Sequence, residues 1–308
     1  MKSYYRVMLG KGSMYAPECS EGKFIGTDFG IREDLSTKLP DDWRAFNKSY
    51  IPIFLQNNPG KSKVAAGLAC GALWTVSKGM QQGDIALCPD GTGNYHVGEI
   101  TGDYYYQPDG VLPHRRKVQW YKLSIDRNEM SEGLRNSTGS IGTVSNITKH
   151  HIEIEKLLAG IEVPVLVSSD ETVEDPSAFA MESHLEDFLV NNWSQTELGK
   201  DFNIYQDEDG LLGKQYDTDT GPMDILAISK DGKTLLVIEL KKGRASDVVV
   251  GQILRYMGYV KDVLAEEDQS VRGAIIALDN DPRIQRALVV VPDVEFYRYE
   301  ISFKLVKS

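Results

Sequence analysis

Two apolar runs in the C-terminal half, separated by a short turn sequence, constrain the fold of this chain most strongly. They are residues 223–229 (MDILAIS) and 233–241 (KTLLVIELK), and Lys230-Asp231-Gly232 lies between them. A Gly that follows Asp between two such runs is typical of a β-hairpin. The pattern therefore predicts two antiparallel strands.

The end of the second run carries an acid and a base. Side chains alternate along a strand, so Glu239 and Lys241 share one face while Ile238 and Leu240 point into a core. In the hairpin, Asp224 opens the first strand near the point where Glu239 closes the second. We therefore expect two carboxylates and one ammonium group at one end of the sheet.

This trio suits the metal-assisted hydrolysis of phosphodiesters. Two carboxylates can hold Mg²⁺ or Mn²⁺, which neutralises developing charge and lowers the pKa of an attacking water. A Lys can orient that water or stabilise the pentavalent phosphate. The alternative is an ordinary exposed Glu–Lys pair worth about 0–1 kcal/mol, because the pattern Glu-x-Lys is common.

The surrounding sequence resembles a known family. The segments GPMDILAI, LLVIELKKGRAS, VGQILRYMGYV and VRGAIIA follow one another as in the C-terminal nuclease domain of the NucS/EndoMS endonucleases, a branch of the PD-(D/E)XK superfamily. The resemblance extends from about Met181 onward. It implies that Asp224 and Glu239 are metal ligands and that Lys241 is the catalytic lysine. It also implies auxiliary active-site roles for Gln252 and Tyr256.

The segment MESHLEDFL resembles the first helix of that family, which supplies a further acid to the metal site. At about 100° per residue, one apolar stripe of this helix is formed by Met181, Leu185, Phe188 and Leu189. Glu182 lies beside the stripe and Glu186 lies further toward solvent. We therefore predict that Glu182 is the third ligand, the alternative being that both are solvated surface acids.

Helical periodicity over residues 246–260 also defines a buried stripe, formed by Val249, Ile253, Tyr256 and Val260. Gln252 lies on its flank, one turn before Tyr256. Ser246 is a candidate N-cap. Taken alone, Tyr256 fits a core position equally well, so its predicted role depends on the resemblance.

Length and composition indicate two domains in an intracellular protein. The chain has 308 residues and 41% hydrophobic residues, enough for two cores. No run approaches the roughly 18 apolar residues of a membrane span, and the N-terminus lacks the apolar core of a signal peptide. Cys19, Cys70 and Cys88 are far apart, which indicates neither disulfides nor a zinc site. We expect a cytoplasmic location without membrane association.

The formal net charge of −11 disfavours nucleic-acid binding at first sight, because Lys and Arg provide the affinity for phosphate. Nuclease sites are themselves acidic, however, and a local basic face is sufficient. Candidate faces are Lys241, Lys242 and Arg244, or residues 114–117 (HRRK).

Residues 1 to about 150 have short apolar runs separated by Gly, Pro, Asn and Asp. Residues 60–79 indicate a helix, and strands are expected at YYRVML, GDIALCPDG, YHVGEIT and KVQWYKLSI. Residues 83–87 and 95–100 would pair as a hairpin. This spacing predicts a small barrel-like α+β domain.

The segments GDIALCPDGTGNYHVGEITGDYYY and HRRKVQWY resemble the N-terminal domain of modification-dependent (type IV) restriction endonucleases, which is similar to PUA/EVE β-barrels. Such a resemblance implies a pocket for a flipped, modified base, which needs aromatic faces and polar groups. The candidates are Trp74, Tyr104, Tyr105 and Trp120 for stacking, Asp84 as a polar partner, and Arg115 and Arg116 as phosphate contacts. Core packing is the competing role for each aromatic residue.

The expected organisation is a recognition domain (1–155), a linker (156–180) and a nuclease domain (181–308). A short helix is expected at HHIEIEKLLAG, and the acidic segment LVSSDETVEDPS is typical of a linker. The C-terminal half has the order of an αβββαβ core, and Asp281-Pro282 would begin its last helix. The fold class is α/β and α+β in two domains.

Together these features predict an anti-phage DNA endonuclease that detects a modified base, a modified cytosine, in double-stranded DNA and cuts with Mg²⁺ or Mn²⁺. Cutting both strands with one active site per chain favours a homodimer. One alternative is a NucS/EndoMS-like mismatch or branched-DNA repair endonuclease. Another is a DNA-binding protein whose nuclease fold is catalytically silent.

Overall fold

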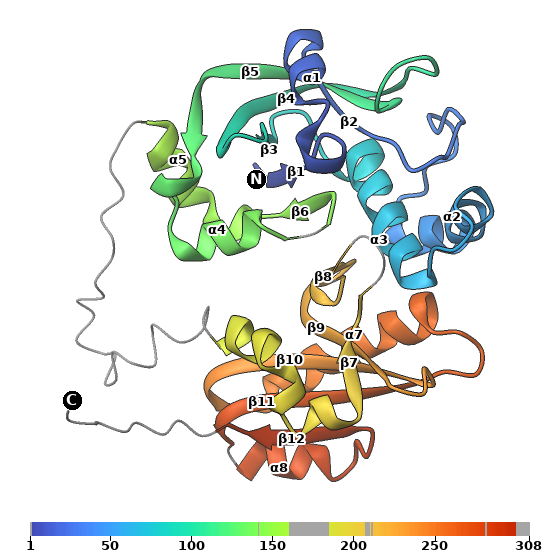
Figure 1. Cartoon of the computed structure of the whole chain (residues 1–308), viewed down its shortest axis with the longest axis vertical. Helices are drawn as coiled ribbons and strands as arrows, with labels where there is room; N and C mark the ends of the chain where they lie inside the picture. Colours follow the sequence, from blue (N-terminus) through green and yellow to red (C-terminus); the bar gives the residue numbers. More distant parts are fainter. Residues whose placement is uncertain are drawn as a thin grey trace. The chain divides into compact units, whose positions relative to one another are not determined.

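The computed structural model describes residues 2–140, 142–159, 185–206, 210, 212–280 and 282–299. The chain divides into two compact units (Figure 1). The first comprises Met1–Val167 with Asp207–Leu212, and the second comprises Ser168–Gln206 with Gly213–Ser308.

The N-terminal unit is built on a six-stranded sheet with the order β2-β5-β4-β3-β1-β6. Its strands are β1 (Tyr4–Val7), β2 (Phe24–Thr27), β3 (Ile85–Pro89), β4 (Asn94–Tyr106), β5 (His114–Asp126) and β6 (Val144–Asn146). Strands β1 and β3 are parallel, and the other pairs are antiparallel. The predicted hairpin is confirmed, because Ile85 pairs with Glu99 and Leu87 with Val97.

The described strand pairings do not close this sheet into the predicted PUA/EVE-like barrel. The edge strands β2 and β6 lie at opposite ends of the strand order, and no described ladder joins them. They have only four and three residues, and the next elements after β2 are two helices. The expectation of a closed barrel is therefore corrected to an open sheet.

Helices in this unit are α1 (Ala16–Gly22), α2 (Trp43–Asn57), α3 (Lys63–Trp74) with the π-helical turn η2 (Thr75–Gly79), α4 (Glu132–Thr138) and α5 (His151–Leu158). Short 3₁₀ turns are η1 (Lys11–Ser13), η3 (Arg127–Glu129) and η4 (Thr148–His150). The predicted helices over 60–79 and in HHIEIEKLLAG are confirmed. Ser62 begins α3 as an N-cap, since its Oγ accepts from Ala65 N at 3.1 Å.

Both faces of the central strands are buried. Tyr5 and Ala86 belong to one apolar cluster, whereas their chain neighbours Tyr4 and Ile85 belong to another. Side chains alternate between faces, so each strand contributes to two cores.

The C-terminal unit has a mixed sheet with the order β12-β11-β10-β9-β7, and β8 pairs with β9. After a helix over 185–191 come η5 (Trp193–Gln195), η6 (Leu198–Lys200), β7 (Phe202–Ile204), β8 (Lys214–Thr218), β9 (Gly221–Ser229), β10 (Thr234–Ala245), α7 (Val248–Tyr259), η7 (Val260–Leu264), β11 (Ser270–Asn280), α8 (Pro282–Leu288) and β12 (Val294–Arg298). The predicted order of helices and strands is confirmed, with β8 as an additional strand. Asp281, the predicted cap, lies outside the described residues.

The predicted central hairpin is confirmed as β9 and β10. Ile225 pairs with Ile238 and Ile228 with Leu235 in an antiparallel ladder. At the turn, Gly232 has φ 76°, a conformation that favours glycine. Lys233 N donates to Asp231 Oδ1 at 3.0 Å.

The stripe on α7 is also confirmed, because Val249, Ile253, Tyr256 and Val260 are all buried. The N-cap prediction is wrong by one residue, since Asp247 occupies that position without a side-chain cap. None of the helices in the described part of the chain is long and apolar enough to cross a membrane.

Candidate active site

Asp224 and Glu239 meet at one end of the β9–β10 hairpin. They lie one residue beyond the Ile225–Ile238 pair of the ladder. Asp224 Oδ2 accepts a hydrogen bond from Leu240 N at 2.7 Å. The structure therefore brings the two carboxylates together as the strand alternation predicts.

Glu239 is a buried carboxylate with one unsatisfied oxygen. Its side chain is 2% exposed, and its Oε1 accepts from Lys241 Nζ at 2.6 Å. Its Oε2 has no hydrogen-bond partner in the described part of the chain. Burial, followed by the negative charge of Asp224, raises the pKa of Glu239 to about 7. Leaving a buried polar atom unpaired is costly, so this oxygen is suited to a ligand that brings positive charge.

A third acid reaches the site from the helix over 185–191. Gln215 Nε2 donates to Glu186 Oε2 and, at 3.1 Å, to Asp224 Oδ1. Lys214 Nζ lies 3.4 Å from Glu186 Oε1 and also pairs with Asp187. Burial raises the pKa of Glu186, although the charge of Lys214 opposes this effect.

The predicted orientation of this helix is wrong in part. Leu185 and Leu189 are buried as expected, but Phe188 is 63% exposed and the Glu186 side chain only 15%. Strand β8 contributes Gln215 and Lys214, both of which contact Glu186, whereas the sequence prediction left this acid facing solvent. Glu182, the predicted ligand, lies outside the described residues.

Tyr256 and Gln252 of α7 lie on the side of Asp224 and Glu239. Tyr256 is buried, and burial, together with the negative charges of Glu239 and Asp224, raises the pKa of its hydroxyl, while a hydrogen bond with Gln252 lowers it. An added Cβ at Gly221 would lie 3.6 Å from Tyr256 Oη, so the first residue of β9 lies close to the tyrosine. Both residues therefore lie near the two carboxylates.

These residues fit a hard divalent cation. Within the described ranges, no three Asp, Glu, His or Cys side chains already form a metal cage. Asp224 and Glu239 nevertheless supply carboxylate oxygens, the donor type that Mg²⁺ and Mn²⁺ prefer. The buried, unsatisfied Oε2 of Glu239 is the atom that a cation would satisfy.

Lys214, Gln215 and Glu186 were missed in the sequence. Strand β8 is short and polar (KQYDT), and it lacks an apolar run. The one available sign is alternation, because Tyr216 and Thr218 are buried on one face between Gly213 and Gly221.

In the N-terminal unit, the predicted base-binding residues make internal contacts. Asp84 is buried, and its carboxylate accepts from Ser3 N and Gln81 N, both at 2.8 Å. Trp74 Nε1 donates to Pro40 O at 3.0 Å, and its ring stacks on Trp43 with centroids 6.1 Å apart.

The two predicted phosphate contacts differ in exposure. Arg116 is 5% exposed and donates to the carbonyls of Val76 at 2.8 Å and of Gly102 and Ser77 at 3.3 Å. The structure gives it an internal role in place of the predicted phosphate contact.

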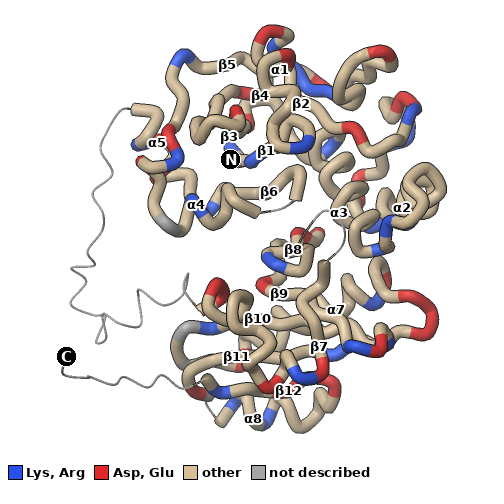
Figure 2. The backbone as a smooth tube through the Cα atoms, viewed as in Figure 1, with Lys and Arg blue, Asp and Glu red and all other residues tan. Residues whose placement is uncertain are grey.

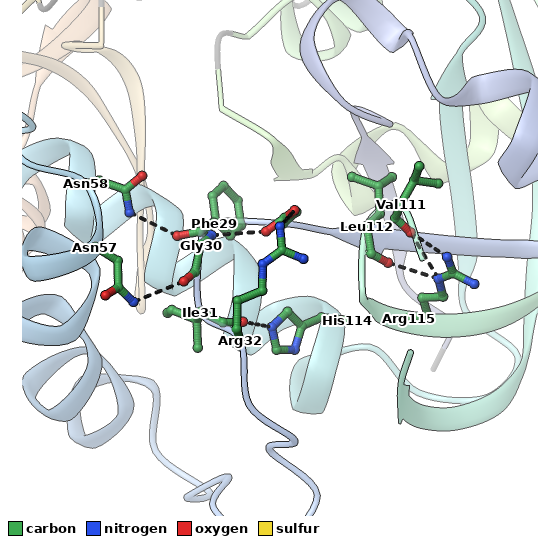
Figure 3. A network of polar contacts seen from close by, with 11 residues as sticks. Phe29, Gly30, Ile31, Arg32, Asn57, Asn58, Val111, Leu112, His114 and Arg115 are labelled. Atoms are coloured by element: carbon green, nitrogen blue, oxygen red, sulfur yellow. Dashed lines mark hydrogen bonds and ion pairs between the residues drawn. The ribbon is translucent and has the colours of Figure 1, made fainter. Parts of the chain in front are cut away.

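Arg115 is half-buried. Its guanidinium donates to the Val111 and Leu112 carbonyls, as Figure 3 shows. It also lies over the Phe24 ring, 3.8 Å from the centroid.

The remaining aromatic residues do not form one stacking site. Tyr104 hydrogen bonds to His114 Nδ1 at 2.9 Å, and His114 Nε2 contacts Ile31 O (Figure 3). Trp120 Nε1 donates to Cys19 O at 3.2 Å. Tyr105 pairs in register with Arg115. The described contacts thus connect these residues to separate parts of the unit.

In the view of Figure 2, basic and acidic residues are interspersed along both units. The predicted basic face over 114–117 is reduced, because His114 and Arg116 are buried, Arg115 is half-buried and Lys117 alone is exposed.

The C-terminal unit is similar to a known class of nuclease domains. Residues 181–300 match the family model described as the Endonuclease NucS C-terminal domain. Residues 5–148 match a model described as a domain of unknown function, DUF8426. The match supports a NucS-like nuclease domain, and the PUA/EVE resemblance stays a prediction.

One curated relative carries the same family name. The chain is 31% identical to the Endonuclease NucS of Sulfolobus acidocaldarius over 123 residues, which cover 40% of this chain and 42% of that protein. It therefore spans less than half of this relative.

Among solved structures, a repair endonuclease from Pyrococcus abyssi has a TM-score of 0.30 at 16% identity, covering 69% of this chain and 66% of that one. A structure described as an EndoMS-dsDNA2 complex has a TM-score of 0.32 at 14% identity, covering 71% and 66%.

Proposed function

We propose that this protein is a divalent-cation-dependent DNA endonuclease. The observation that carries the proposal is the buried Oε2 of Glu239, which has no donor in the described part of the chain and lies beside Asp224 and Lys241. An ordinary surface Glu–Lys pair would not be buried in this way. The match of residues 181–300 to the NucS C-terminal domain supports the same assignment.

Asp224 and Glu239 would hold Mg²⁺ or Mn²⁺, and Glu182 or Glu186 would complete the site. A bound cation supplies charge neutralisation and a more acidic water. Lys241, whose side chain is 34% exposed, would orient the attacking water or stabilise the phosphate. Gln252 and Tyr256 would position the same groups from α7.

The N-terminal unit would direct this activity to DNA that carries a modified base, with modified cytosine of phage genomes as the expected target. Support comes from the resemblance of residues 83–120 to the recognition domain of modification-dependent restriction endonucleases. Its internal contacts move the candidate surface away from Arg116 and Asp84. Exposed residues near Tyr105 and Arg115 remain candidates for contact with DNA. A homodimer would allow both strands to be cut.

A second candidate is a mismatch or branched-DNA repair endonuclease. The 31% identity to an Endonuclease NucS favours it, and the C-terminal site serves either function equally well. A catalytically silent DNA-binding protein is disfavoured because Asp224, Glu239 and Lys241 are all present and adjacent.

The two enzymatic candidates differ in their substrates. Matched phage genomes containing plain cytosine or hydroxymethylated or glucosylated cytosine would be incubated with Mg²⁺ and either wild type or Glu239→Ala. Cleavage of only the modified genome, absent in the variant, is the expected result. Equal cleavage of both genomes would reject the modification sensor and favour mismatched or branched substrates as the next test.

A further inference from the structure

Gln215 has a backbone conformation that is unusual for its residue type. Its φ is 49°, in the left-handed region, and it lies within strand β8. Side chains with a Cβ are strained there, and long ones have no local compensation as Asn and Asp do. Such strain persists where surrounding contacts require it. A glycine would adopt this φ more easily, which indicates that contacts of the Gln215 side chain offset the strain of its backbone.

The side chain of Gln215 makes contacts that provide this reason. Its Nε2 donates to both Glu186 Oε2 and Asp224 Oδ1. It therefore bridges an acid of the helix over 185–191 to an acid of β9. Both carboxylates are thus fixed by one neutral group, which adds donors without a further charge.

The left-handed residue also changes the alternation of β8. In a regular strand, Lys214 and Gln215 would point to opposite faces. Here both side chains reach Glu186. Lys214 Nζ lies 3.4 Å from Glu186 Oε1, and Gln215 Nε2 donates a hydrogen bond to Glu186 Oε2. Each oxygen of Glu186 consequently has its own donor, and the carboxylate is held in one orientation.

We propose that Gln215 is a positioning residue whose amide holds the Glu186 and Asp224 carboxylates together for a divalent cation. This inference rests on the proposed function, because it concerns the cation site of the same nuclease. Groups that hold metal ligands in place typically contribute 10- to 100-fold to affinity or activity. Gln215 touches the acids and acts through them.

The test compares Mn²⁺ binding by the full-length protein, measured by calorimetry, in wild type, Gln215→Leu and Gln215→Gly. The Leu variant keeps the side-chain size but removes the amide, and the Gly variant also relieves the backbone strain. Gln195→Leu, at an exposed glutamine in η5, is the matched control. We expect at least about tenfold weaker Mn²⁺ binding in both Gln215 variants and none of this loss in the control. The thermal midpoint of Gln215→Gly without cation should equal or exceed that of Gln215→Leu.

DNA cleavage gives a second readout. For both Gln215 variants, the Mn²⁺ concentration needed for half-maximal cleavage should rise at least about tenfold, and high Mn²⁺ should restore the rate. If both variants bind Mn²⁺ as tightly as wild type, or if Gln215→Gly does not fold, the inference about Gln215 is wrong. The proposed function would still stand in that case if the wild-type protein cleaves DNA. A wild type that binds Mn²⁺ without cutting DNA would reject the proposed function, and the calorimetry would still decide the role of Gln215. A wild type that does not bind Mn²⁺ would reject both.

Discussion

Replacing Glu239 by Gln should stabilise the cation-free protein and remove one ligand of the proposed cation site. Burial and the charge of Asp224 raise the pKa of Glu239 to about 7, from an ordinary value of 4.5. Since one pKa unit corresponds to about 1.4 kcal/mol, the ionised carboxylate costs the folded state about 3 kcal/mol. An uncharged amide avoids this cost.

The sign of the pH dependence follows from the raised pKa. Between pH 4.5 and 7 the folded protein binds more protons at Glu239 than the unfolded chain, so wild-type stability falls as pH rises through this window. Glu239→Gln lacks this dependence. The variant should therefore be about as stable as wild type at pH 4.5 and about 3 kcal/mol more stable at pH 8.

Urea unfolding in EDTA at both pH values measures this difference. Glu197→Gln, at an exposed acid paired with Lys200, is the matched control and should change the free energy of unfolding by less than about 0.5 kcal/mol. If Glu239→Gln is no more stable than wild type at pH 8, then burial of the ionised Glu239 carboxylate does not destabilise the folded protein. In parallel samples without EDTA, added Mn²⁺ should stabilise wild type and leave the variant unchanged.

Three further predictions concern other residues. Asp224→Ala and Lys241→Ala should lose cleavage but retain DNA affinity in gel-shift assays, and a loss of affinity would mean that DNA binding depends on this site. Arg116→Ala should lower the stability of the N-terminal unit by about 3 kcal/mol, because two buried carbonyls, of Val76 and Ser77, and the half-buried carbonyl of Gly102 lose a donor. The dependence of DNA affinity on salt concentration should be the same for this variant as for wild type. A shallower salt dependence would show that Arg116 does contact phosphate. Burial lowers the pKa of His150 to about 4, so wild-type stability should fall between pH 6.5 and 4 by about 1–2 kcal/mol more than that of His150→Gln in chemical denaturation, allowing for partial exposure.

The parts of the fold that the sequence predicts correctly are those with a strong period. The alternation of the β9–β10 hairpin placed Asp224 beside Glu239, and the 3.6-residue period of α7 placed Tyr256 in the core. In both cases an apolar face decides the orientation, so local pattern and tertiary packing agree.

The structure differs from the sequence prediction where a polar strand, β8, packs against the candidate site. Strand β8 has no apolar run, so neither the strand nor the contacts of Gln215 with Glu186 could be expected. When β8 is not anticipated, the sequence of the helix over 185–191 shows only an apolar stripe, and this pattern predicts that Glu186 faces solvent.

In the N-terminal unit, the burial of Arg116 and the open sheet differ from the sequence prediction for a related reason. Arginine in a basic run is usually exposed, but Arg116 alternates inward on β5 and caps the carbonyls of η2. Burial of a cation is decided by partners distant in sequence. The open sheet likewise depends on which strands remain at the edges, and this is not visible in strand spacing.

Cleavage of duplex DNA by the 308-residue chain in Mg²⁺ or Mn²⁺, with wild type beside Lys241→Ala, tests whether this protein is a metal-dependent nuclease. The substrates should include plain, cytosine-modified, mismatched and branched duplexes. We expect wild type to cut at least one of these substrates, EDTA to stop the reaction, and Lys241→Ala not to cut. Cleavage by wild type that persists in EDTA, or that is unchanged in Lys241→Ala, would contradict this expectation.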